Sequence, residues 1–148
     1  MKLFITLFTI LMFSSLTAQD HYNLKKGFVA KGYDVVAYFE NEAIKGDDQF
    51  ISEYEDVSYK FSSKKNLNIF NSKPEKYVPQ YGGYCAYAVA VKGDKVDINP
   101  KTFQIIDDKL YLFYNKLGVN TLENWNEEGV EKLKKQANEN WEKLVKKE

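Results

Sequence analysis

Cys85 is the only cysteine in this chain of 148 residues, and that count limits what can hold the chain folded. A single thiol cannot form an internal disulfide. Together with the single histidine, His21, it cannot complete a Cys₄, Cys₂His₂ or His₂Cys metal site. Stability must therefore come from the packing of apolar side chains. Residues 77–87 surround the thiol with four tyrosines and two adjacent glycines, which predicts a turn and a thiol walled by aromatic rings.

The first residues have the composition of a secretory signal peptide. A basic start, Met1-Lys2, is followed by an apolar run over residues 3–13 and by small residues up to Ala18. The pattern predicts a signal peptide over residues 1–18, cleaved after Ala18, and hence a periplasmic or secreted protein. The apolar run is too short to span a bilayer, so no stable membrane insertion is expected after cleavage. A buried N-terminal helix and an uncleaved anchor are the alternatives.

The rest of the chain is expected to form an N-terminal extension, residues 19–31, and a single domain, residues 32–148. The 21 basic and 21 acidic residues of the whole chain balance, and loss of Lys2 with the signal peptide leaves a net charge of −1, so no strong field favours nucleic acid as a partner. The lysines near the C-terminus alternate with glutamates, which is typical of the solvated face of a helix.

The residue patterns predict an α+β fold, with a small antiparallel sheet of hairpins packed by short helices and a long C-terminal amphipathic helix. Residues 33–39 are rich in β-forming residues and predict a strand. Two hairpins are expected, residues 50–54 with 57–61 and residues 103–106 with 110–114.

Helices are expected between and after these hairpins. Ser62 or Ser63 is a suitable N-cap for a short helix that carries Leu67 and Phe70 inward. Residues 84–91 fit a helix or a strand equally well. Apolar residues recur at helical spacing from about Asn126 to Val145, which predicts one long helix capped by Asn126.

Several segments together resemble exported bacterial proteins of the YHS-domain family. They are residues 32–39, residues 59–63 with Asn66, Phe70, Pro74, Lys76 and Tyr77, residues 81–86, and residues 108–112. The resemblance runs from about residue 32 to Trp141 and implies a small YHS-like α+β domain with metal-binding relatives. Some YHS-type domains carry cysteines around the Phe-x-Ser segment. Here those positions are Ser62, Ser63 and Asn66, which leaves Cys85 as the soft ligand.

Cys85 is therefore the first candidate metal ligand. If residues 84–91 are helical, it lies in the first turn, where the helix dipole stabilises a thiolate. A thiolate prefers soft ions such as Cu(I), and a homodimer that brings two copies of Cys85 together would supply a second sulfur. The alternatives are a buried, inert thiol and an intermolecular disulfide.

His21 is the second candidate ligand. Cleavage after Ala18 would create a terminus that reads Gln19-Asp20-His21, whose amine, amides and imidazole form a square-planar set for Cu(II) or Ni(II). Cyclisation of the terminal Gln19 would remove the amine. The alternative is a histidine on a disordered terminus.

No catalytic constellation is visible, since His21 is remote in sequence from Cys85 and no spacing selects a pair of carboxylates. We therefore expect an exported, non-enzymatic YHS-like protein that binds or handles a soft metal ion, a copper ion first, through Cys85. The alternative is a ligand- or protein-binding module in which Cys85 is structural and metal-free. A third interpretation is an enzyme or accessory subunit that uses a tyrosine-lined pocket.

The exported protein is expected to begin at Gln19, because small residues precede Ala18 and a short apolar run lies before them. The intact mass of protein exported by its own signal peptide measures this. A mass that retains residues 1–18 would contradict the prediction. Loss of ammonia from Gln19 would report the cyclised terminus in the same spectrum.

Overall fold

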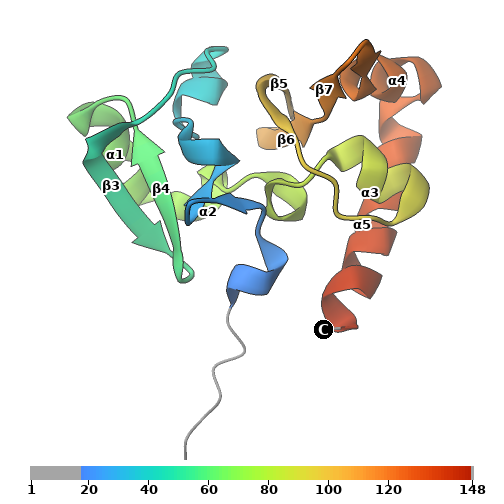
Figure 1. Ribbon diagram of the computed structural model, residues 1–148, viewed down its shortest axis with the longest axis horizontal. Helices are drawn as coiled ribbons and strands as arrows, with labels where there is room; N and C mark the ends of the chain where they lie inside the picture. The colour runs from blue at the N-terminus through green and yellow to red at the C-terminus, as the bar shows by residue number, and fades with distance from the viewer. Residues whose placement is uncertain (1–17, 148) are drawn as a thin grey trace, which may run out of the picture.

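The computed structural model describes residues 18–147, so the predicted signal peptide lies almost entirely outside the described residues. The chain forms two halves. A sheet of strands β1–β4, within residues 24–61, and helix α1 (Lys64–Ser72) lie on one side (Figure 1). The helices α3 (Ala86–Lys92), α4 (Thr121–Glu128) and α5 (Val130–Lys146) lie on the other (Figure 1). The hairpin of β5 (Asn99–Ile106) and β6 (Lys109–Phe113) lies between them (Figure 1). This arrangement confirms the predicted α+β fold of hairpins, short helices and a long C-terminal helix.

The sheet of the first half has the order β1-β2-β4-β3. The predicted extension supplies two of its strands, β1 (Leu24–Lys25) and β2 (Phe28–Val29), and β2 runs parallel to β4. The predicted first hairpin is confirmed as β3 (Asp47–Tyr54) and β4 (Val57–Phe61). Alternate residues of β4 are buried, as the period of two requires.

The strand expected over residues 33–39 is wrong. Tyr33 makes one isolated bridge to Lys45, and the chain then enters the 3-10 helix η3 (Ala37–Glu40). The reason is Asp34, whose Oδ1 accepts hydrogen bonds from the N–H groups of Val36 at 2.9 Å and Ala37 at 3.2 Å. Such a local acceptor competes with strand pairing and favours a turn.

The other carboxylate oxygen of Asp34 holds a distant segment. Its Oδ2 accepts from the backbone N–H of Ser62 at 2.8 Å, the hydroxyl of Ser62 at 2.7 Å and the side-chain amide of Asn66 at 2.8 Å. Asp34 is 0% exposed. Its buried charge is therefore stabilised by five hydrogen-bond donors, which join the turn at residues 34–37 to the start of α1.

The predicted short helix is confirmed as α1 (Lys64–Ser72), with Ser63 as its N-cap at 3.1 Å from the N–H of Asn66. Leu67 and Phe70 point inward, as expected. A four-residue helix, α2 (Pro74–Tyr77), and the 3-10 helix η4 (Gln80–Gly83) follow. They carry the chain from the first half to the second.

The predicted second hairpin is confirmed as β5 (Asn99–Ile106) and β6 (Lys109–Phe113), and a short hairpin of β7 (Asn115–Lys116) and β8 (Val119–Asn120) follows it. Strand β6 is buried on both faces. Leu110 and Leu112 belong to the hydrophobic core of the first half, and Tyr111 and Phe113 belong to the core of the second. One strand therefore connects two cores.

The ambiguous segment after Gly83 is the helix α3 (Ala86–Lys92). The single long helix expected from Asn126 is instead two helices, α4 (Thr121–Glu128) and α5 (Val130–Lys146). They are separated at Gly129, whose φ of 106° is incompatible with a continuing helix.

The expected cap of the C-terminal helix is also wrong. Asn120 caps α4 by accepting from the N–H of Leu122 at 3.2 Å, and Asn126 lies inside that helix. Leu133 and Ala137 of α5 are buried as their spacing predicted. The fully buried tryptophan is Trp125, whereas Trp141 is half-buried.

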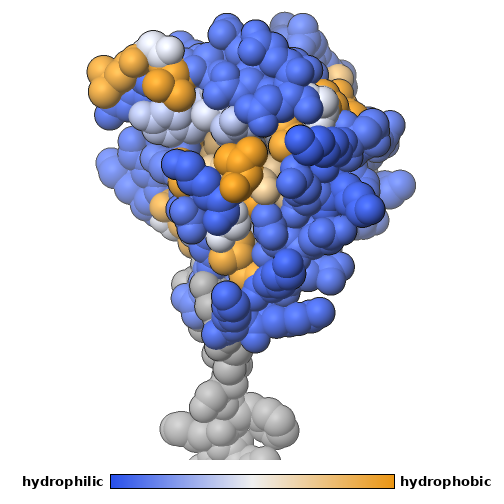
Figure 2. Space-filling model, turned by 90° about the vertical axis from the view of Figure 1, so that its right-hand side faces the viewer, coloured by the Kyte–Doolittle hydropathy of each residue, from blue (hydrophilic) through white to orange (hydrophobic). Residues whose placement is uncertain are grey.

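The surface formed by α3, α4 and α5 is mainly hydrophilic, with only small hydrophobic areas (Figure 2). Most of the lysines and glutamates of α5 are exposed, which agrees with the predicted solvated face. Within residues 18–147, no helix combines the length and the apolar composition needed to cross a membrane.

Replacing Asp34 by Ala should lower the free energy of unfolding by about 3 kcal/mol or more, because it leaves several buried donors without an acceptor. Asp34→Asn should also destabilise the protein, since one of its two acceptor oxygens becomes a donor. Chemical denaturation at neutral pH measures both. The matched control is Asp48→Ala, which removes an exposed partner of Lys60 and should change stability little. Equal effects of Asp34→Ala and Asp48→Ala would contradict the role given to Asp34.

Candidate functional site

Cys85 is 0% exposed and lies immediately before α3. Its sulfur accepts a hydrogen bond from the backbone N–H of Tyr114 at 3.3 Å and lies 3.3 Å from the hydroxyl of Thr121. Its backbone N–H donates to the carbonyl of Val96 at 2.9 Å. The residue thus joins three segments of the second half through hydrogen bonds. In this arrangement its sulfur is not presented to a second copy of the chain.

The tyrosines near Cys85 do not wall the thiol as the sequence suggested. Tyr77 packs on Phe39 with ring centroids 5.0 Å apart, and Tyr81 packs on Trp141 at 6.1 Å. The hydroxyl of Tyr84 reaches the carbonyl of Tyr22 at 3.3 Å. Of these four tyrosines, only Tyr87 lines the cavity beside Cys85.

That cavity has a volume of about 270 Å³ and is largely apolar. It is lined by Ala88, Val91, Val96 and Val119 together with Cys85, Tyr87, Lys92, Tyr114, Thr121 and Asn124. The cavity lining brings no second sulfur or imidazole to Cys85. A Cu(I) ion needs at least two soft ligands, so the residues around Cys85 in one chain do not fit the copper site predicted from its thiolate.

His21 ends the 3-10 helix η1 (Ala18–His21) and is half-buried. Its Nδ1 atom is buried. His21 and Cys85 also line different cavities, and the structure does not bring the two predicted ligands together.

The segment that carries His21 is held against η4. The N–H of Asn23 donates to the carbonyl of Gly82 at 2.8 Å, and its side chain reaches Asp97 at 3.0 Å. A Cβ atom on Gly82 would lie 1.8 Å from the carbonyl oxygen of His21. Only glycine permits this approach, so the Gly-Gly pair serves backbone packing rather than metal access.

Within residues 18–147, no group of three His, Cys, Asp or Glu side chains is placed to hold a metal ion. A larger hollow than the cavity beside Cys85 lies elsewhere. It is a groove of about 810 Å³ between the first half and α5. Its walls come from four parts of the chain, with the lining residues His21, Tyr22, Glu55, Val78, Pro79, Gln80, Tyr81, Gly82, Asn138, Trp141, Glu142 and Val145.

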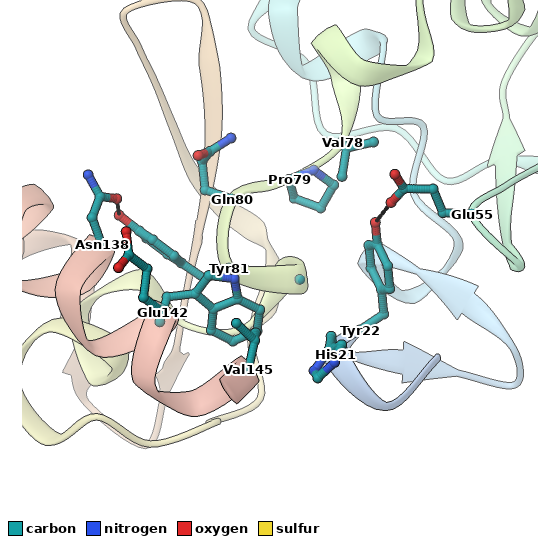
Figure 3. A pocket seen from close by; sticks show the side chains of 12 residues that line it. His21, Tyr22, Glu55, Val78, Pro79, Gln80, Tyr81, Asn138, Glu142 and Val145 are labelled. Carbon is teal, nitrogen blue, oxygen red and sulfur yellow. Dashed lines mark hydrogen bonds between the residues drawn. The ribbon is translucent and has the colours of Figure 1, made fainter. Parts of the chain in front are cut away.

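Figure 3 shows Tyr22 and Glu55 on one side of the groove and Asn138 and Glu142 on the other. The Tyr22 hydroxyl donates to Glu55 at 2.7 Å. Burial and the neighbouring Glu55 carboxylate raise the pKa of Tyr22 well above its ordinary value. The phenol therefore keeps its proton and holds the carboxylate in place.

The opposite wall is built on α5. The Tyr81 hydroxyl donates to the side-chain oxygen of Asn138 at 2.9 Å, and the Tyr81 ring packs on Trp141. Burial raises the pKa of Tyr81, so this phenol is also a permanent donor. The φ of Tyr81 is 54°, a left-handed conformation that places its ring under α5. The two walls are thus fixed by hydrogen bonds.

The groove residues Glu55, Asn138 and Glu142 carry no signal in the sequence. They are ordinary surface types, and only the folded chain brings them together. The usable signals were Trp141, one of the apolar residues that recur at helical spacing in the C-terminal segment, and the tyrosine-rich segment that contains Tyr81.

Comparison of the chain with protein-family models, with curated proteins and with solved structures finds no match in any of the three.

The Cys85 thiol is expected to react with a disulfide reagent far more slowly in the native protein than in the unfolded chain, because it is buried and hydrogen-bonded. Absorbance of the released thiolate measures the two rates. Equal rates would show that the thiol is accessible.

Titration of Cu(I) against a competitor chelator, with wild type and Cys85→Ser, tests the remaining prediction of copper binding. A structural thiol should give the same weak binding in both proteins. If the wild type binds Cu(I) with a defined stoichiometry and Cys85→Ser does not, Cys85 is established as a ligand.

Proposed function

We propose that this chain is an exported, non-enzymatic binding module whose ligand site is the groove between the first half and α5, with Cys85 as a structural thiol. The observation that carries the proposal is the lining of the groove. Aromatic rings and polar groups from sequence-distant segments converge there on a hollow of about 810 Å³. This volume lies within the range of about 300–1,000 Å³ that is usual for small-ligand sites.

The construction of the groove supports a binding role. Tyr22 and Glu55 are joined at 2.7 Å, and Tyr81 and Asn138 at 2.9 Å, so the polar groups of both walls are ordered before a ligand arrives. A preorganised site loses less conformational entropy on binding than a mobile one. Trp141 is half-buried, with one part packed on Tyr81 and another facing the groove.

The contacts of Cys85 support the structural part of the proposal. The Tyr114 N–H and the Thr121 hydroxyl surround the sulfur, and both belong to the segment that leads into α4. A buried thiol with such partners acts as a small packing residue. The resemblance to exported YHS-domain proteins stays a prediction, and the groove proposal does not depend on it.

The test uses the two tryptophans as reporters. Trp141 lines the groove, whereas Trp125 is fully buried in the core of the second half, so their indole N–H signals report binding inside and outside the site. A library of small fragments is added to ¹⁵N-labelled protein. At least one fragment is expected to shift the Trp141 signal and leave that of Trp125 unchanged.

A variant pair completes the test. Trp141→Ala removes one wall of the groove and should abolish binding of the fragments found, measured by calorimetry. The control Leu117→Ala removes an 89% exposed side chain outside the groove and should leave binding unchanged. The absence of any fragment that shifts Trp141, or equal binding by Trp141→Ala and wild type, would contradict the proposed function.

A further inference from the structure

We propose that the groove selects an organic amine, a ligand with a protonated ammonium group on an apolar or aromatic body. This inference rests on the proposed function and names the ligand class of that site. It follows from the charges that face the groove, from the way one of these charges is fixed, and from the aromatic rings between them.

The fixed charges of the lining are negative. Glu55 and Glu142 contribute carboxylates from opposite walls (Figure 3). All 21 basic residues of the chain are lysines, yet none of the residues that line the groove is a lysine. A hollow bounded by carboxylates and low-dielectric walls concentrates cations and repels anions. The overall charge of the chain is near zero, so this preference is local to the groove.

Glu55 is held in position by a neighbour that cannot become a competing anion. The hydroxyl of Tyr22 donates to it at 2.7 Å and occupies one acceptor direction. A carboxylate has several acceptor directions, so the others are left for a ligand donor. Because the Glu55 carboxylate is already held in place, it loses less conformational entropy when an ammonium group binds to it.

Glu142 has a competing cation. The Nζ atom of Lys146 lies 3.8 Å from a carboxylate oxygen of Glu142, and both side chains are exposed. An exposed pair at this distance contributes little to stability, so a ligand ammonium can replace the lysine at small cost. Removing the charge of Lys146 should therefore strengthen amine binding. If Glu142 had only a structural role, this change would not strengthen it.

The rings of the groove suit the same ligand. Tyr22, Tyr81 and Trp141 line the space between the two carboxylates, and the face of an aromatic ring attracts a cation. Val78 and Val145 add apolar surface for the body of the ligand. A lone metal cation would not use this surface, whereas an amine on an apolar chain would use both parts.

The experiment compares three probes that share one body and differ in charge, namely 4-phenylbutylamine, 4-phenylbutanol and 4-phenylbutyrate. Calorimetry and the Trp141 indole signal measure their binding to the wild-type protein. The amine is expected to bind most tightly, the alcohol more weakly and the carboxylate not at all. Binding of the amine should weaken as salt is raised, because the exposed carboxylates are screened.

Charge variants test the two carboxylates. Glu55→Gln and Glu142→Gln should each weaken amine binding by up to about five-fold and leave the alcohol unaffected. Lys146→Gln should strengthen amine binding. Glu139→Gln is the matched control, since Glu139 is exposed on the same helix but does not line the groove.

The outcomes separate the inference from the proposed function. If all three probes shift Trp141 equally, the groove binds ligands and the charge preference is wrong. If none binds, the amine inference fails, and the fragment library decides the proposed function. Equal losses in Glu142→Gln and Glu139→Gln would show a general charge effect and would also overturn the inference. If the protein self-associates and the amine does not reverse this, the lysines of a second copy are the occupant of the groove. That result would also overturn the inference.

Discussion

The arrangement of the whole molecule depends on the burial of strand β6 on both faces. Leu110 and Leu112 complete the core that contains the first sheet, whereas Tyr111 and Phe113 complete the core that contains Trp125. A strand shared in this way cannot slip by one residue without exchanging its two faces. It therefore fixes the position of the first half relative to α5, and the groove lies between these two parts.

Asp34 fixes segments of the first half relative to one another, as β6 fixes the two halves of the molecule. Its buried carboxylate collects donors from its own turn and from Ser62 and Asn66, so the turn at residues 34–37 and the start of α1 cannot move apart. These positions lie in segments from which a resemblance to YHS-domain proteins was predicted. Their spacing has a direct physical explanation in this structure, because Ser62 and Asn66 are hydrogen-bond donors to one buried charge. This explanation does not require a metal ion.

The sequence predicted those helices and strands that are determined by residues close together in the chain. Both hairpins have two-residue turns, Glu55-Asp56 and Asp107-Asp108, with positive φ, and a helix cap such as Ser63 acts over three residues. The predicted strand over residues 33–39 failed because its β propensity was outweighed by Asp34, whose local turn at Val36 and Ala37 is held in place by donors distant in sequence. The break between α4 and α5 was visible only as Gly129, which the apolar periodicity on either side concealed.

The candidate site was harder to predict, because its side chains become neighbours only through long-range packing. Cys85 attracted attention as a rare residue in an unusual segment, but rarity alone does not distinguish a buried thiol from a ligand. Glu55 and Glu142 belong to a β-turn and a solvated helix face, and nothing in either local pattern relates one to the other. Their relation is created by β6 and by the close approach of His21 to Gly82.

The start of the described chain is itself part of the groove. The Asp20 carbonyl accepts from the Lys95 ammonium group at 3.1 Å, and His21 lines the groove one residue later. Cleavage after Ala18 would therefore leave the new terminus close to the proposed site. A free α-amino group there would be a cation, whereas a cyclised Gln19 would carry no charge. Processing of the N-terminus would then change the charge of the segment that leads into His21 and the groove.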